Sequence, residues 1–191
     1  MTNPNRAALR AVYAKKRGSS DGYDAFFAGL ADVDRANRKA AIAKTRAEKP
    51  APLREFSLKT LDGQVVSPAS LRGKTAVINT WGMWCGPCVA EMPEFQKLAT
   101  KFAGDSTVKI LTIDNDPNTD ELRAWMAKKG YTFTTLIDDG HLKRSGIDTY
   151  PTTWFVDPSG RIVFTKTGWS EQLVEEFTWR VEMIKNRPAV P

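Results

Sequence analysis

The pattern of apolar and polar side chains divides the chain near residue 50. Before that point, apolar positions recur with the period of an α-helix in three successive pieces, which end near Gly18, Leu30 and Glu48. The middle piece carries a cluster with helical i, i+3, i+4, i+7 spacing: Tyr23, Phe26, Phe27 and Leu30. Because such a cluster is costly to expose, we expect it to dock on the main domain or on a second subunit.

A change of periodicity follows the helical region. Pro50-Ala51-Pro52 blocks continuation of a helix and predicts a linker. Beyond it, short apolar runs alternate with turn residues, and the first pair predicts a hairpin in which Phe56-Ser57-Leu58 and Val65-Val66 flank Asp62-Gly63. We therefore predict a helical extension over residues 1–50 and a main domain over residues 51–191.

Strands and helices alternate through the main domain. A buried strand over 76–81 leads into a helix that ends at Gly104, and a second strand over 108–113 completes a parallel βαβ unit. Three further elements follow: a helix over 119–129, a strand over 135–137, and a hairpin of 153–157 with 161–166. The last helix is predicted to start after Ser170 as N-cap, with an apolar face towards the sheet at Leu173, Phe177, Val181 and Ile184. This pattern indicates an α/β domain.

Composition and charge narrow the function classes. The chain has 191 residues, of which 41% are hydrophobic and 26% are charged, as in ordinary globular proteins. Its net charge of +6 lies entirely in residues 1–50, where 11 Lys and Arg side chains oppose 5 Asp and Glu. The neutral main domain lacks the basic surface that phosphate contacts need, so we expect no nucleic-acid partner. No apolar run approaches the ~18 residues of a membrane span.

Cys85 and Cys88 are the only two cysteines in the sequence. A disulfide between residues this close removes little entropy from the unfolded chain, so a purely stapling role is not expected. A structural zinc ion needs four ligands, and His141 is the only histidine, so we expect no metal. The two remaining interpretations are a redox pair and two ordinary half-buried thiols.

The position of the pair between a strand and a helix favours redox chemistry. Unpaired N–H groups and the helix dipole stabilise a thiolate at a helix N-terminus, which makes Cys85 the expected nucleophile. Cys88 would then resolve the mixed disulfide. Pro87 is tolerated in a first helical turn, and Gly86 leaves room for a partner chain to approach.

The strongest resemblance lies in the motif Trp84-Cys85-Gly86-Pro87-Cys88, with Val77-Ile78-Asn79-Thr80-Trp81 before it and Glu91-Met92-Pro93 after it. This region resembles the thioredoxin superfamily and, more closely, the TlpA/ResA-like thiol-disulfide oxidoreductases. The similarity extends from about residue 52 to residue 185 and leaves residues 1–50 outside. It implies a thioredoxin-like fold with a central mixed sheet flanked by helices, no bound cofactor, and a bacterial protein on the periplasmic side of the cytoplasmic membrane.

The resemblance also suggests a proton carrier. Glu91 follows Cys88 by three residues and so shares its helix face. Thioredoxin has a buried Asp in the strand before the motif, whereas this chain has Asn79, which does not titrate. Glu91 would therefore replace that Asp as catalytic acid and base, with a raised pKa; the alternative is a solvated helix residue.

Further residues are expected to contact the partner. Pro151 matches the cis-proline of the superfamily, beside which an extended substrate strand can pair, and Tyr150 would shape the partner groove or belong to the core. Trp81 and Trp84 would cover the disulfide or pack under the sheet, and we expect Trp84 to be the more exposed. We expect His141 to be a loop residue without a catalytic role.

These observations favour an enzyme that exchanges dithiol for disulfide with protein partners. Cys-Gly-Pro-Cys is also the motif of strongly reducing thioredoxin, whose potential is about −270 mV, so we expect a reductant supplied by an upstream electron donor. A peroxidase of the peroxiredoxin type would need Pro and Thr ahead of its cysteine, where this chain has Thr80-Trp81-Gly82-Met83-Trp84. The alternative from another class is a binding module in which residues 1–50 engage a partner and the main domain is a scaffold.

The expected location depends on the N-terminus. The first residues lack the apolar core of a secretory signal. An extracytoplasmic protein, tethered in its full-length form, would require that this chain be trimmed from a longer one, which is the interpretation we favour. A complete chain would be cytoplasmic.

Overall fold

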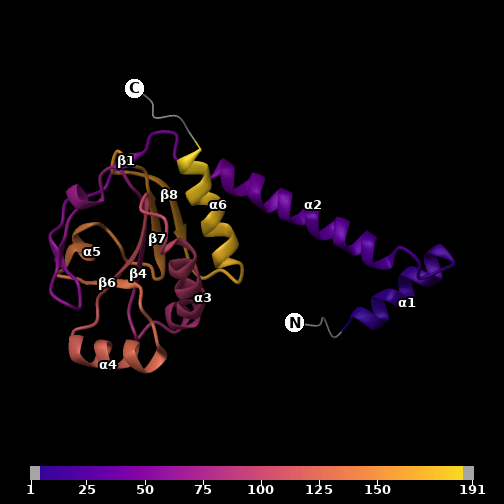
Figure 1. The fold of residues 1–191 in the computed structure, drawn as a ribbon, viewed down its shortest axis with the longest axis horizontal. Helices are drawn as coiled ribbons and strands as arrows, with labels where there is room; N and C mark the ends of the chain where they lie inside the picture. Colours follow the sequence, from indigo (N-terminus) through magenta and orange to yellow (C-terminus); the bar gives the residue numbers. More distant parts are fainter. Residues whose placement is uncertain (1–4, 187–191) are drawn as a thin grey trace. The chain divides into compact units, whose positions relative to one another are not determined.

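The computed structural model describes residues 5–186 and divides the chain into two compact units, with the boundary between Ala41 and Ile42 (Figure 1). The first unit contains α1 (Arg6–Arg17) and most of α2 (Tyr23–Lys44). Gly18 ends α1 with a φ of 80°, a left-handed conformation that glycine adopts without a Cβ clash. The second and third helical pieces predicted from the sequence form the single helix α2, which continues through Gly29 at the expected junction.

The aromatic cluster of the first unit is partly buried by α1. Tyr13 packs edge-on against Tyr23, with ring centroids 5.6 Å apart, and lies 5.4 Å from Phe26. Tyr23 is thereby 3% exposed, and its hydroxyl donates to the carbonyl of Arg6. For Tyr23 the expectation of docking elsewhere is therefore wrong, because the preceding helix already covers it. Phe26 and Leu30 stay 40% and 49% exposed.

The second unit is built on a six-stranded mixed sheet. In spatial order its strands are β1 (Ala51–Pro52), β8 (Arg161–Thr167), β7 (Thr152–Val156), β4 (Thr75–Trp81), β5 (Val108–Asp114) and β6 (Thr134–Ile137). Strands β4, β5 and β6 are parallel, whereas β7, β8 and β1 pair antiparallel. A separate hairpin joins β2 (Leu58–Lys59) to β3 (Val65–Val66), as the sequence predicted.

Alternation along the central strand β4 assigns its side chains to two cores. Val77 and Trp81 face a hydrophobic cluster that receives side chains from three helices: α3 (Gly86–Phe102), α4 (Thr119–Lys129) and α6 (Leu173–Lys185). Ala76 and Ile78 face the opposite cluster, which includes residues of the short helices η1 (Pro68–Leu71) and α5 (His141–Arg144). Asn79 is therefore on the face that α3 covers, because side chains alternate along a strand.

Two local predictions were wrong. The expected linker contains the edge strand β1, where Ala51 pairs with Ile162 and Pro52 with Arg161. An edge strand tolerates Pro because the missing N–H costs no bond with an outer neighbour. Ser170 does not cap α6; Gln172 occupies that position, and the Ser170 hydroxyl accepts from the Gln172 N–H at 3.3 Å. The predicted apolar face of α6 is confirmed, because its four residues are all buried.

Candidate active site

The two cysteines form a disulfide where β4 gives way to α3. Cys85 is the N-cap of α3, and its sulfur accepts a hydrogen bond from the Cys88 N–H at 3.3 Å. The S–S distance is 2.04 Å. The strand-to-helix position predicted from the sequence is confirmed, and the helix N-terminus lies directly against the first sulfur.

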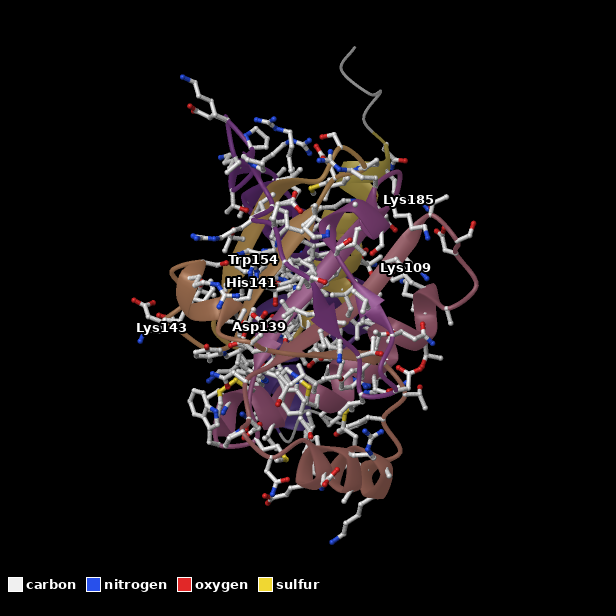
Figure 2. The ribbon with its side chains drawn as sticks, turned by 90° about the vertical axis from the view of Figure 1, so that its left-hand side faces the viewer. Lys109, Asp139, His141, Lys143, Trp154 and Lys185 are labelled. Atoms are coloured by element: carbon white, nitrogen blue, oxygen red, sulfur yellow. A yellow bond between two sulfur atoms is a disulfide. The ribbon has the colours of Figure 1, made fainter. Side chains whose placement is uncertain are left out.

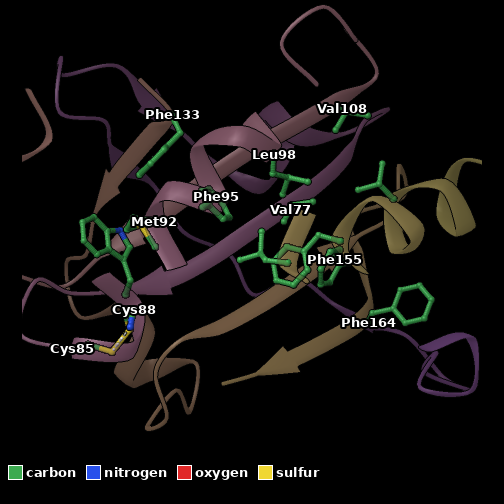
Figure 3. Close-up of a cluster of buried hydrophobic side chains, with 14 of the residues drawn as sticks. Val77, Cys85, Cys88, Met92, Phe95, Leu98, Val108, Phe133, Phe155 and Phe164 are labelled. Carbon is green, nitrogen blue, oxygen red and sulfur yellow. Dashed lines mark hydrogen bonds between the residues drawn. A yellow bond between two sulfur atoms is a disulfide. The ribbon is translucent and has the colours of Figure 1, made fainter. Parts of the chain in front are cut away.

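The two cysteines differ in their access to solvent. Cys85 is 6% exposed and Cys88 is fully buried, the order that a nucleophile and a resolving thiol would require, although both are largely covered. Figure 3 shows the disulfide at one end of the hydrophobic cluster that α3, α4 and α6 cover, with Cys88 next to Met92. A partner's sulfur can therefore approach Cys85, whereas Cys88 is shielded by the core.

Glu91 lies buried behind the disulfide. It projects from α3 with 1% exposure, and Asn79 on β4 donates to its Oε1 at 2.8 Å. The same Asn79 amide donates to the Thr153 hydroxyl on β7 at 2.9 Å. Burial raises the pKa of Glu91 to about 7, although the Asn79 hydrogen bond and the charge of Lys166 lower it in part. The solvated interpretation of Glu91 is wrong, and its carboxyl group can exchange a proton near neutral pH.

Pro151 and the aromatic residues lie around the disulfide as expected. The Tyr150–Pro151 peptide bond is cis. Trp84 is 60% exposed and Trp81 is fully buried, which confirms their predicted order. An apolar groove of about 590 Å³ starts at the first turns of α3, and six residues line it: Pro87, Ala90, Tyr150, Pro151, Gly168 and Trp169.

Comparison with known proteins places this geometry in a family. Residues 48–165 match the model of the AhpC/TSA family. The chain belongs to that family. It is 34% identical to thiol-disulfide oxidoreductase ResA of Halalkalibacterium halodurans over 134 residues, which cover 68% of this chain and 73% of the relative. It is 31% identical to sporulation thiol-disulfide oxidoreductase A of Bacillus subtilis over 140 residues, or 70% and 84% of the two chains.

Solved structures agree with this assignment. The fold is similar to that of a thiol:disulfide interchange protein of the thioredoxin family from Chlorobium tepidum, with a TM-score of 0.62 and 26% identity over 72% of this chain and 98% of the other. This AhpC/TSA family member is a thiol-disulfide oxidoreductase, and its fold is thioredoxin-like, with helices flanking a mixed sheet and N-terminal helices in addition.

His141 departs from the sequence prediction. It opens α5 and is fully buried, with its ring 5.0 Å from that of Phe56 and 6.4 Å from that of Trp154. Figure 2 shows it beside Trp154 and Asp139. Burial lowers the pKa of His141, and its Nε2 lies 3.2 Å from the Ser145 hydroxyl. The tertiary structure covers a residue that its polar neighbours in the sequence had suggested was in a loop.

The segment Asp114-Asn115-Asp116 contributes residues that the sequence prediction missed. It comprises the last residue of β5 and the two residues after it, next to the end of β4 that leads into the cysteine motif. The Asp116 carboxylate accepts the Met83 N–H at 2.6 Å, and burial next to Asp116 raises the pKa of Asp114. Three polar residues at the carboxyl end of a strand parallel to β4 were the available signal, because parallel strands end at the same edge.

Metal-ligand clusters and membrane-spanning helices are both missing from the part of the chain that the structure describes. Within residues 5–186, no three His, Cys, Asp or Glu side chains are grouped so as to hold a metal ion. In the same range, none of the helices combines the length and the apolar content that crossing a bilayer requires.

The buried carboxyl of Glu91 predicts how stability depends on pH. Its pKa rises from an ordinary value of 4.5 to about 7 in the fold, so the folded state binds the proton more tightly and loses stability as pH rises from about 4.5 to above 7. This shift corresponds to about 3 kcal/mol. We expect Glu91→Gln to remove most of that loss in chemical unfolding between pH 4 and 8, and Glu94→Gln, at a half-buried position on the same helix, to retain it. Parallel stability curves for wild type and Glu91→Gln would contradict the raised pKa.

Proposed function

We propose that this oxidoreductase reduces disulfides in partner proteins, with Cys85 as nucleophile, Cys88 as resolving thiol and Glu91 as proton acceptor. The observation that carries the proposal is the asymmetry of the pair. Cys85 caps a helix and keeps some access to solvent, while Cys88 is buried on the helix face that also presents Glu91. The helix N-terminus stabilises the thiolate of Cys85, and burial delays attack by Cys88 until a partner is bound.

The reaction proceeds through two exchanges. The Cys85 thiolate attacks one sulfur of the partner disulfide, forms a mixed disulfide and releases the other partner sulfur as a thiolate. Cys88 gives its proton to the Glu91 carboxylate and attacks the Cys85 sulfur. The second partner thiolate leaves, and the Cys85–Cys88 disulfide forms. Two electrons have then passed to the partner, and an upstream dithiol donor must return the enzyme to its reduced form.

The partner is expected to lie across the groove beside the disulfide. Gly86 and Pro87 form the first turn of α3 next to Cys85, and Tyr150 and Pro151 line the same groove as Pro87. Trp84 presents an exposed ring at the rim. We assign these five residues to substrate binding, because an incoming chain must pass them to reach the Cys85 sulfur.

The reduction potential tests the direction of electron transfer. We expect equilibration with glutathione to give a value near that of thioredoxin, about −270 mV, because the dipeptide between the cysteines is the same. A value above about −180 mV, in the range of oxidising isomerases, would overturn the reductant assignment. Because Cys85 and Cys88 are the only cysteines of the chain, the measured equilibrium reports on this pair alone.

We further propose an extracytoplasmic location, by analogy with the relatives that the resemblance identified. The proposal treats residues 51–191 as the catalytic domain and residues 1–50 as a basic helical extension. Fractionation of cells that produce the full-length protein tests the location.

A further inference from the structure

Asn115 joins the two sides of the active site through its side-chain amide. Its Oδ1 accepts from the Trp84 indole N–H at 3.0 Å, and its Nδ2 donates to the Tyr150 hydroxyl at 3.1 Å. Trp84 precedes the first cysteine, and Tyr150 precedes the cis-proline. One half-buried amide therefore links the loop that carries the disulfide to the loop that lines the groove.

The linked rings form a continuous wall. Trp84 and Tyr150 pack edge to face, with centroids 5.2 Å apart and planes inclined by 76°. Gly82 allows this arrangement, since a Cβ there would lie 2.4 Å from the Trp84 Nε1 and 2.8 Å from the Asn115 Oδ1. The loop beneath is held by the Met83 N–H bond to Asp116. Although Trp84 is 60% exposed, its indole is held by the hydrogen bond to Asn115 and by packing against Tyr150.

A fixed exposed ring binds more tightly than a mobile one. Ordering a side chain during association costs free energy, and a ring that is already held avoids that cost. Asn115 does not line the groove itself. It acts on the partner through Trp84 and Tyr150, which makes it a positioning residue.

The chemistry of the groove indicates which partner side chains would bind beside the fixed rings. All six residues that line it are uncharged, and Tyr150 belongs both to the groove and to the wall that Asn115 holds. Trp169, which is 45% exposed, lines the same groove. A bulky apolar side chain close to the reacting cysteine of a partner would fill this groove and gain from apolar burial.

We propose that Asn115 positions Trp84 and Tyr150 so that the enzyme prefers partner segments with a bulky apolar residue beside the reacting cysteine. The inference rests on the proposed reduction of protein disulfides and names the substrate feature that the site selects.

Two peptide disulfides test the preference. They are identical except for Phe or Ser next to the cysteine, and each is reduced by the reduced full chain under steady-state conditions. We expect wild type to favour the Phe peptide by about tenfold in kcat/KM, the scale of selectivity that an apolar pocket gives. Asn115→Ala should lower that ratio to about twofold, mainly through a higher KM for the Phe peptide. Its near-UV circular dichroism should also lose intensity in the tryptophan region.

Two further variants separate positioning from general damage. Tyr150→Phe keeps the ring and removes one of the two hydrogen bonds, so its ratio should lie between those of wild type and Asn115→Ala. Asn118→Ser is the matched control, because serine can still cap α4 in place of the Asn118 side chain, and it should keep the wild-type ratio.

The outcomes distinguish this inference from the proposed function. If wild type reduces neither peptide, the proposed function fails. If wild type reduces both with equal kcat/KM, or if Asn115→Ala slows both by the same factor, the function stands and the role of Asn115 is overturned. An unchanged ratio in both Asn115→Ala and Tyr150→Phe would also overturn it.

Discussion

Cys88→Ser is expected to accumulate a mixed disulfide between Cys85 and its partner, whereas Cys85→Ser should lose both the adduct and turnover. Without Cys88, no internal thiol can attack the Cys85 sulfur, so the intermediate persists until an external thiol removes it. Without Cys85, the remaining thiol is fully buried and lies away from the N-cap position. Turnover should fall by about 10³-fold or more, as expected when a covalent nucleophile is removed.

Non-reducing mass spectrometry after mixing each reduced variant with a disulfide-bonded protein measures this result. The two single variants control for each other, because each retains one thiol in the same motif. If Cys85→Ser accumulates the adduct and Cys88→Ser does not, the roles of the two cysteines are reversed.

Glu91→Gln is expected to slow resolution of the mixed disulfide by at least about tenfold near neutral pH. Glutamine keeps the shape and can still accept from Asn79, but it cannot take the proton from Cys88. General acid–base assistance typically contributes about 10²- to 10⁴-fold. Attack by Cys85 should change much less, since the end of α3 stabilises its thiolate.

The rate of mixed-disulfide resolution should depend on pH in a direction set by the ionisation of Glu91. Proton transfer to Glu91 requires its ionised form, so with a pKa of about 7 the wild-type resolution rate should rise as pH increases through 7. Glu91→Gln should lack that rise. Stopped-flow measurements from pH 5 to 9 would follow formation and decay of the adduct separately. Glu94→Gln, on the same helix and more exposed, is the matched control. Equal decay rates in wild type and Glu91→Gln throughout that range would contradict the role of Glu91 as proton acceptor.

The same carboxyl group links activity to stability. A Glu that is 1% exposed opposes folding whenever it is charged, and the side chain that donates a hydrogen bond to it, Asn79, is a neutral amide. If this position had only a packing role, the neutral side chain of glutamine would stabilise the fold more than glutamate does. The stabilisation expected for Glu91→Gln above pH 7, together with its slower resolution, therefore forms a combined signature of a functional carboxylate.

Local sequence determined the elements and the reacting pair. The apolar run over 76–81 became the fully buried β4, and the helix predicted over 119–129 is α4 at the same bounds. Cys85, Gly86 and Pro87 form a helix start from neighbours in the chain, so their placement needs no distant contact. The resemblance carried by that motif predicted the cis bond before Pro151, which local chemistry does not specify.

Only the tertiary structure decided which distant residues meet. Asn79, Glu91 and Thr153 form one buried network because β4, α3 and β7 pack together, and nothing in their local patterns specifies the hydrogen bonds. Asn115 reaches Trp84 and Tyr150 across separations of 31 and 35 residues. Periodicity reports which face of an element is buried, whereas partners within that face depend on strand order and register, which arise from packing over the whole domain.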